Sequence, residues 1–267
     1  MQINGCELYV HQVGAGTPVV FSHGLLWSGR MFEPQLRALS ARYRCVAYDH
    51  RGQGRSESPR GDILRGHGIS IELVYRDAVK LIEQLELGPC HFVGLSMGGF
   101  VGQRIAARRP ELLRSLVLLE TAADPEPKHN RPKYRALNVI GRMGGLSLVA
   151  SPVMPIMFGD TFLRDPYRAQ ERDRWIGQLK QNRRSIYKAV NGVIERGGFE
   201  DQLDKIQVPT LILHGQEDRA IAMHRAEALH AGIAGSQLVK LPRGGHTSTI
   251  EEPELVNTEI SRFIAQH

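Results

Sequence analysis

The apolar residues of this chain gather in short continuous runs, separated by segments of helix length. Continuous apolar runs are typical of strands buried on both faces of a parallel sheet, whereas alternation of apolar and polar residues indicates a strand with one exposed face. The run ELYVHQVG alternates, and GAGTP ends it, so it is expected as an exposed strand. Buried strands are expected in the runs PVVFSHG, YRCVAYDHRG, CHFVGLS, RSLVLLE, TLILHG and QLVKLP.

The segments between these runs have the pattern of amphipathic helices, of which IELVYRDAVKLIEQLEL (71–87) is the clearest. Strands that alternate with helices predict a mostly parallel central sheet flanked by helices. This alternation stops between LVLLE (116–120) and VPTLILHG (208–215), and the gap is too long for a single loop in a compact domain. We therefore predict an α/β core formed by residues 1–121 and 202–267, with a helical cap inserted at 122–201.

Composition narrows the classes to which the protein can belong. Its 267 residues are 42% hydrophobic and 23% charged, close to the averages for globular proteins, which excludes disordered and fibrous classes. No apolar run reaches the roughly 18 residues of a membrane-spanning helix, and the start lacks a signal-peptide pattern. A cytoplasmic protein without a membrane partner is expected. The three cysteines are far apart and form no CxxC pair, so neither a disulfide framework nor a zinc site is indicated.

The net charge of +6 comes from one part of the chain, since the excess of Lys and Arg falls within residues 121–200. These basic residues alternate with acidic and apolar ones, which is typical of solvated helix faces. A nucleic-acid-binding surface would need a concentrated basic patch within a recognisable module. We therefore expect no nucleic-acid partner, although the basic cap would favour an anionic substrate through electrostatic steering.

The stretch HFVGLSMGGFVG places a single serine among glycines, between an expected strand and an expected helix. Gly94, Ser96 and Gly98 match the G-x-S-x-G nucleophile elbow, a strained turn that lifts the serine hydroxyl clear of the sheet. Side chains at the two glycine positions would collide with neighbouring backbone. Ser96 is therefore the candidate nucleophile.

A serine nucleophile needs a base that accepts its proton and an acid that orients the base. Asp218 follows the expected strand TLILHG, and His246 follows the next expected strand, QLVKLP. Both would lie beyond the carboxyl ends of strands, where open α/β sheets bind ligands. Two backbone N–H groups are expected to stabilise the oxyanion: that of Met97, directly after the nucleophile, and that of Leu25, in the loop after PVVFSHG.

These motifs occur in one order: FSHG (21–24), YDHRGQGRS (48–56), GLSMGG (94–99), LHGQED (213–218) and GGH (244–246). In this order they resemble the α/β-hydrolase family over almost the whole chain, and more narrowly its bacterial esterase and enol-lactonase branch. The resemblance implies the α/β-hydrolase fold with an inserted cap. Because Ser96 stands where the dehalogenase and epoxide hydrolase branches carry aspartate, it implies acyl transfer. Some members place the acid after the sixth strand, which leaves Glu120 and Asp124 as alternatives to Asp218.

The resulting hypothesis is a serine hydrolase that cleaves carboxylic esters of small to medium groups through a Ser-His-Asp triad and an acyl-enzyme, with no metal or organic cofactor. A lactonase or a carbon–carbon bond hydrolase would use the same triad, and a perhydrolase or a non-enzymatic ligand-binding protein are further alternatives. The expected partner is a small-molecule ester or lactone, and the oligomeric state is not predicted. The substrate pocket is expected to include Trp27, Met31, Met154, Met157, Phe158 and Trp175.

Overall fold

The computed structural model describes residues 1–58 and 68–267 of the chain. Within these residues, seven strands form one sheet in the order β3-β5-β4-β6-β7-β8-β9, in which β3 is antiparallel to β5 and the other neighbours are parallel. The strands are β3 (Val10–Val13), β4 (Thr17–Ser22), β5 (Tyr43–Tyr48), β6 (Cys90–Leu95), β7 (Leu113–Leu119), β8 (Thr210–Gly215) and β9 (Gln237–Leu241).

Burial follows the position of each strand in the sheet. The central strands β6 and β8 are buried at every residue, as their continuous apolar sequences predict. The edge strand β3 is exposed at both inner positions, and the alternating segment 7–14 is divided between it and an N-terminal hairpin. That hairpin consists of β1 (Gln2–Ile3) and β2 (Cys6–Glu7).

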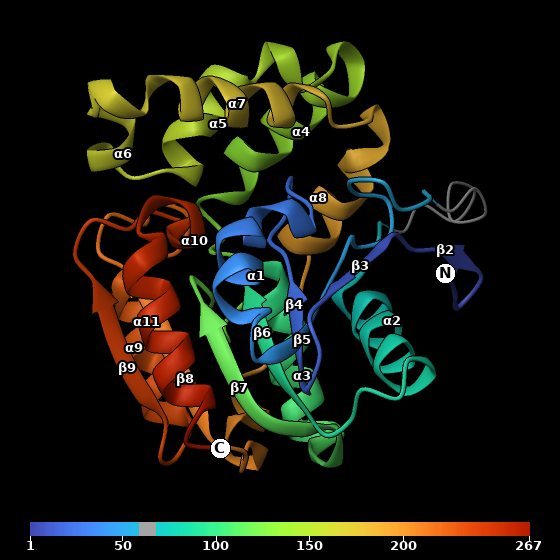
Figure 1. The fold of residues 1–267 in the computed structure, drawn as a ribbon. Helices are drawn as coiled ribbons and strands as arrows, with labels where there is room; N and C mark the ends of the chain where they lie inside the picture. Colours follow the sequence, from blue (N-terminus) through green and yellow to red (C-terminus); the bar gives the residue numbers. More distant parts are fainter. Residues whose placement is uncertain (59–67) are drawn as a thin grey trace.

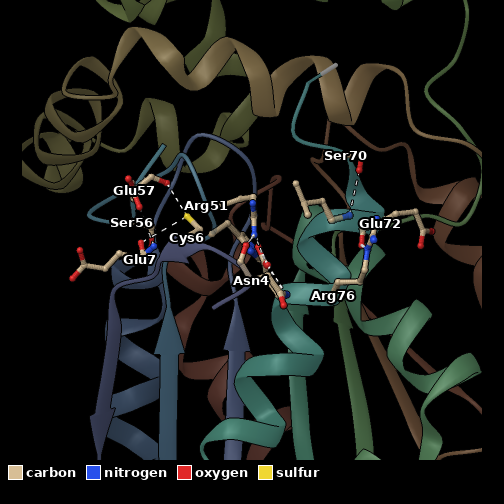
Figure 2. Close-up of polar contacts among 12 residues, drawn as sticks. Asn4, Cys6, Glu7, Arg51, Ser56, Glu57, Ser70, Glu72 and Arg76 are labelled. Carbon is tan, nitrogen blue, oxygen red and sulfur yellow. Dashed lines mark hydrogen bonds and ion pairs between the residues drawn. The ribbon is translucent and has the colours of Figure 1, made fainter. Parts of the chain in front are cut away.

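The hairpin is attached to the core by polar contacts, as Figure 2 shows. The Cys6 thiol donates to the backbone oxygen of Glu57 at 3.3 Å, and the Arg51 guanidinium lies 3.5 Å from the backbone oxygen of Asn4. Arg51 also forms a buried ion pair with Asp77 of helix α2 (Ile71–Gln84). Its Nη2 lies 2.5 Å from Oδ1 of Asp77. These contacts fix the chain that follows β5.

The helices of the core cover both faces of the sheet, and α1 packs against α11 while α2 packs against α3. Helix α2 begins after Ser70, whose side chain accepts a hydrogen bond from the backbone N–H of Leu73 (Figure 2). None of the helices within the described residues is long and apolar enough to cross a membrane. The core helices are α1 (Glu33–Leu39), α2 (Ile71–Gln84), α3 (Met97–Arg108), α9 (Met223–Gly232), α10 (Ser248–Glu251) and α11 (Pro253–Ile264).

Between β7 and β8 the chain forms a second helical layer. Figure 1 shows α4, α5, α6 and α7 lying over the carboxyl ends of the strands. Asn182 holds this layer to the core by donating to the backbone oxygen of Leu26 at 2.8 Å, and Arg183 donates to that of Gly54 at 2.7 Å. We refer to residues 122–201 as the cap. Its helices are α4 (Arg131–Gly144), α5 (Ala150–Met157), α6 (Asp160–Arg164), α7 (Ala169–Lys180) and α8 (Tyr187–Ile194).

Candidate active site

Ser96 lies in the turn between β6 and α3, with φ 52° and ψ −108°. A non-glycine residue rarely adopts a positive φ, so neighbouring structure must hold this conformation. The backbone N–H of Ser96 donates to the oxygen of Leu119 at 2.8 Å, and the Thr121 hydroxyl donates to the oxygen of Ser96 at 3.0 Å. A Cβ atom on Gly98 would lie 1.9 Å from the backbone oxygen of Ser22, so only glycine fits there.

The structure brings Ser96, His246 and Asp218 into one chain of hydrogen bonds. His246 Nε2 lies 2.9 Å from Ser96 Oγ, and His246 Nδ1 lies 2.8 Å from Asp218 Oδ2. The other oxygen of Asp218 accepts the backbone N–H groups of Ala220 and Ile221 at 2.8 and 3.0 Å. All three side chains of the chain are buried. In this arrangement Nδ1–H donates to the carboxylate, so Nε2 is free to accept the serine proton.

The two alternative acids make no hydrogen bond with His246 in the part of the chain that the structure describes. Asp124 instead forms an ion pair with Arg225, Oδ1 to Nε 2.9 Å. Glu120 is fully buried, and this burial, reinforced by the charge of Asp218, raises its pKa well above the usual range. The described residues contain no group of three or more His, Cys, Asp or Glu side chains placed to share a metal ion.

The backbone N–H groups of Leu25 and Met97 have no acceptor among the described residues. Met97 is the first residue of α3, and Leu25 lies in the loop after β4 and lines the same cavity as Ser96. Gln53 contacts both segments, since it accepts from the N–H of Leu26 at 2.9 Å and its amide lies 3.7 Å from the sulfur of Met97. Two unpaired N–H groups beside the serine are suited to stabilise an oxyanion.

His23 supports the loop that carries Leu25. Its Nδ1–H donates to the backbone oxygen of Gly24 at 2.7 Å, and its Nε2 accepts the backbone N–H of His50 at 2.9 Å. Burial lowers the pKa of His23, which agrees with a neutral ring that donates at one nitrogen and accepts at the other. The side chain therefore fixes loop geometry and has no free nitrogen for proton transfer.

A cavity of about 130 Å³ lies between the core and the cap and opens on Ser96 and His246. Its walls are mainly aliphatic and come mostly from the cap. A minority of polar side chains, Glu126, Tyr134, Asn138 and Arg196, also reach it. The apolar lining consists of Leu25, Leu26, Phe100, Leu137, Leu146, Val149, Val153, Ile156, Met157, Val190, Val193, Ile194, Ala220 and Ile221.

Of the residues predicted from the sequence for the pocket, Met157 lines this cavity. The aromatic ones instead pack on each other: the Trp27 ring lies edge-on to Phe158 and Trp175, at centroid distances of 5.8 and 5.5 Å. Met31, Met154 and these rings are buried, and none of them is among the residues that line the cavity at Ser96. They form an apolar contact between cap and core, a role that the sequence does not distinguish from a pocket wall.

Comparison with known proteins places the chain in a family. The family model described as "Alpha/beta hydrolase family" matches residues 19–259. The "Putative carbamate hydrolase RutD" of Rhizobium rhizogenes is 28% identical over 248 residues, 92% of each chain. A thermophilic esterase from Thermogutta terrifontis has a TM-score of 0.88 at 27% identity, over 98% of this chain and 94% of that one. The enol-lactonase from Burkholderia xenovorans has a TM-score of 0.89 at 26% identity, over 98% of both chains. The chain thus belongs to the alpha/beta hydrolase family and is a hydrolase.

Proposed function

We propose that the protein is a serine hydrolase that cleaves carboxylic esters of small to medium acyl or alcohol groups. The observation that carries this proposal is the hydrogen-bonded series of side chains from Ser96 Oγ through His246 to Asp218. Ser96 and His246 line a mainly apolar cavity. The esterase from Thermogutta terrifontis, which shares the fold over nearly the whole chain, supports the same reaction class.

The geometry supports a two-stage mechanism. Ser96 attacks the ester carbonyl while His246 Nε2 takes its proton, and the N–H groups of Leu25 and Met97 stabilise the oxyanion. His246 then protonates the leaving alkoxide, which releases the alcohol and leaves an acyl group on Ser96. Water, deprotonated by His246, attacks this acyl-enzyme, and the acid is released with the serine restored. Asp218 keeps the histidine in the required tautomer throughout.

The volume and the lining of the cavity support substrates with small to medium groups. Its volume of about 130 Å³ is small, and its aliphatic walls suit short or medium hydrocarbon groups. A lactone is the second candidate substrate, because the enol-lactonase from Burkholderia xenovorans is similar over the full length of both chains. Lactone opening would use the same residues, with the leaving alkoxide still joined to the acyl group.

Initial rates on p-nitrophenyl acetate, butyrate and octanoate, on a lactone and on a charged ester test the proposal. Replacing Ser96 with alanine is expected to lower kcat on the order of 10⁶-fold, as loss of a serine nucleophile does elsewhere. Circular dichroism should show that the Ser96→Ala protein stays folded. A fluorophosphonate probe should label the wild type and leave the variant unlabelled. Turnover by the variant above about a tenth of the wild-type rate would refute the proposal.

The charged ester tests electrostatic steering by the basic cap. If steering operates, kcat/KM for this ester falls as ionic strength rises, while that for the butyrate ester stays constant. Equal salt dependence for both esters would remove the anionic substrate from consideration.

A further inference from the structure

Glu251 joins the cap to the segment that carries His246. It is the last residue of α10, and its side chain is buried. Its Oε2 accepts the backbone N–H of Gly159, in the cap, at 2.8 Å. Its Oε1 accepts the backbone N–H of Thr247, the residue after His246, at 3.0 Å. One carboxyl group therefore contacts two segments that meet at the active site.

The Thr247 hydroxyl adds a second connection. Its oxygen lies 2.8 Å from the backbone oxygen of Met157 and 3.0 Å from Oε1 of Glu251. A hydroxyl has one proton, and a carbonyl oxygen only accepts, so Thr247 must donate to Met157 for the shorter contact to be a hydrogen bond. The second contact is then a hydrogen bond only if Glu251 is protonated and donates to Thr247. Met157 lines the cavity at Ser96, so this connection reaches the wall of the candidate active site.

We propose that protonated Glu251 is a positioning residue that acts through Thr247. It holds His246 and the Met157 wall of the cavity in fixed positions relative to each other. The proposal rests on the serine hydrolase function proposed above. In the protonated state the hydrogen bonds run from Glu251 to Thr247 and from Thr247 to Met157. In the ionised state, Thr247 has one proton for two acceptors, and one of the two connections is lost.

The surroundings of Glu251 bring its titration into the neutral range, so that the protonated form prevails below about pH 7. Burial raises its pKa to about 7, against the opposing effect of the N–H groups that it accepts. Buried Glu120 lies close enough for its pKa to rise further when Glu251 is charged. Arg168 packs against the same segment, but it donates to the backbone oxygens of Ile250 and Glu251 and pairs with Glu171.

Two further charged groups lie beside this junction, and both are engaged elsewhere. Glu217, in the loop that carries Asp218, accepts the backbone N–H of Thr161 at 2.8 Å. Asp160 of α6 pairs with Arg219, Oδ2 to Nη2 2.9 Å. We therefore expect the titration of Glu251 to alter the contact between the cap and the segment that carries His246.

The experiment is a pH profile of kcat and KM on p-nitrophenyl butyrate from about pH 5.5 to 9, corrected for the blank. Wild-type kcat is expected to fall severalfold above about pH 7, as Glu251 ionises. Glu251→Gln cannot titrate, so its kcat should stay within about twofold over the alkaline range. At pH 6 the kcat of Glu251→Gln should be lower than that of the wild type. The glutamine amide cannot accept from the N–H groups of both Gly159 and Thr247 and also donate to the Thr247 hydroxyl. Glu252→Gln is the matched control: Glu252 accepts from the N–H of Arg243 and should keep the wild-type profile.

A second pair of variants keeps the test decisive if Glu251→Gln fails to fold. At pH 6, Thr247→Ser retains the hydroxyl and should keep kcat within about twofold, while Thr247→Val should lose about tenfold. An alkaline fall in Glu251→Gln equal to that of the wild type, or equal rates for both Thr247 variants, would overturn the positioning role. Turnover that does not depend on Ser96 would instead overturn the proposed function, so the two failures are distinguishable.

Discussion

Glu126 and Arg196 form an ion pair with Oε2 and Nη1 3.0 Å apart, and their side chains are 6% and 3% exposed. Glu126 lies near the start of the cap sequence and Arg196 lies near its end, so the ion pair joins the two ends of the cap. The Arg196 guanidinium also lies over the Phe100 ring, 4.4 Å from the centroid, and both residues line the cavity at Ser96. A buried pair at this place couples the stability of the cap to the shape of the cavity.

Arg196→Met is expected to destabilise the protein by about 3–5 kcal/mol, because it leaves the Glu126 carboxylate buried without its partner. The double variant Glu126→Leu with Arg196→Met should cost less, since no unpaired charge remains. Urea unfolding of the three proteins measures this. Replacing exposed Arg164, which pairs with Asp160 on the cap surface, serves as the control and should change stability little. A double variant as unstable as the single one would contradict the explanation.

Asp218→Asn is expected to lower kcat on the order of 10⁴-fold, the loss known when the acid of a serine protease triad is replaced by its amide. The asparagine can donate to His246 Nδ1 and so favours the wrong tautomer. Asp124→Asn is the comparison, because Asp124 pairs with Arg225 and not with His246. If the Asp124 variant lost as much activity as the Asp218 variant, the acid would have to be reassigned.

Gly98→Ala is expected to prevent accumulation of folded protein. The added Cβ would lie 1.9 Å from the backbone oxygen of Ser22, and neither the end of β4 nor the start of α3 can move away in the packed core. Gly177→Ala is the control: it lies in α7 with nothing within 4 Å of the added atom and should stabilise the helix by about 0.5–1 kcal/mol. Soluble yield and thermal unfolding distinguish the two, and a folded, active Gly98→Ala protein would disprove the steric argument.

His91 is expected to destabilise the protein in acid. Burial lowers the pKa of His91 to about 4, from 6.5, and its Nδ1 lies 2.8 Å from Ser115 Oγ. Because the unfolded chain binds the proton more readily, the stability contribution is complete above about pH 6.5 and is lost as the pH falls toward 4. Urea unfolding at several pH values should give a shallower acid slope for His91→Gln. Exposed His11→Gln should keep the wild-type slope, and parallel slopes for all three proteins would exclude His91 as the cause.

The fold and the candidate residues Ser96, His246 and Asp218 could be predicted from the sequence because the relevant signals are local. Ser96, Asp218 and His246 each follow an apolar run, and parallel strands bring the residues after their carboxyl ends to one edge of the sheet. The prediction of a cap rests on the length of the gap between two such runs, and helices α4 to α8 lie within that gap. Its helices follow from amphipathic patterns, but their packing does not.

The cavity could not be predicted in the same way. Its walls are aliphatic residues such as Val153 and Val190, which resemble core residues in any single sequence. The aromatic side chains Trp27 and Trp175, which the sequence predicts for the pocket, instead pack edge-on against each other, with ring centroids 5.5 Å apart. The contact between Glu251 and Gly159 joins positions 92 residues apart and has no local signal.

The two ends of the cap meet in space. The backbone N–H of Phe199 donates to the oxygen of Ala123 at 2.9 Å, and both residues are three positions from the residues of the Glu126–Arg196 ion pair. The chain therefore enters and leaves the cap at adjoining points. Because these points adjoin, the sequence between them can change without altering the strand register on which Ser96, Asp218 and His246 depend.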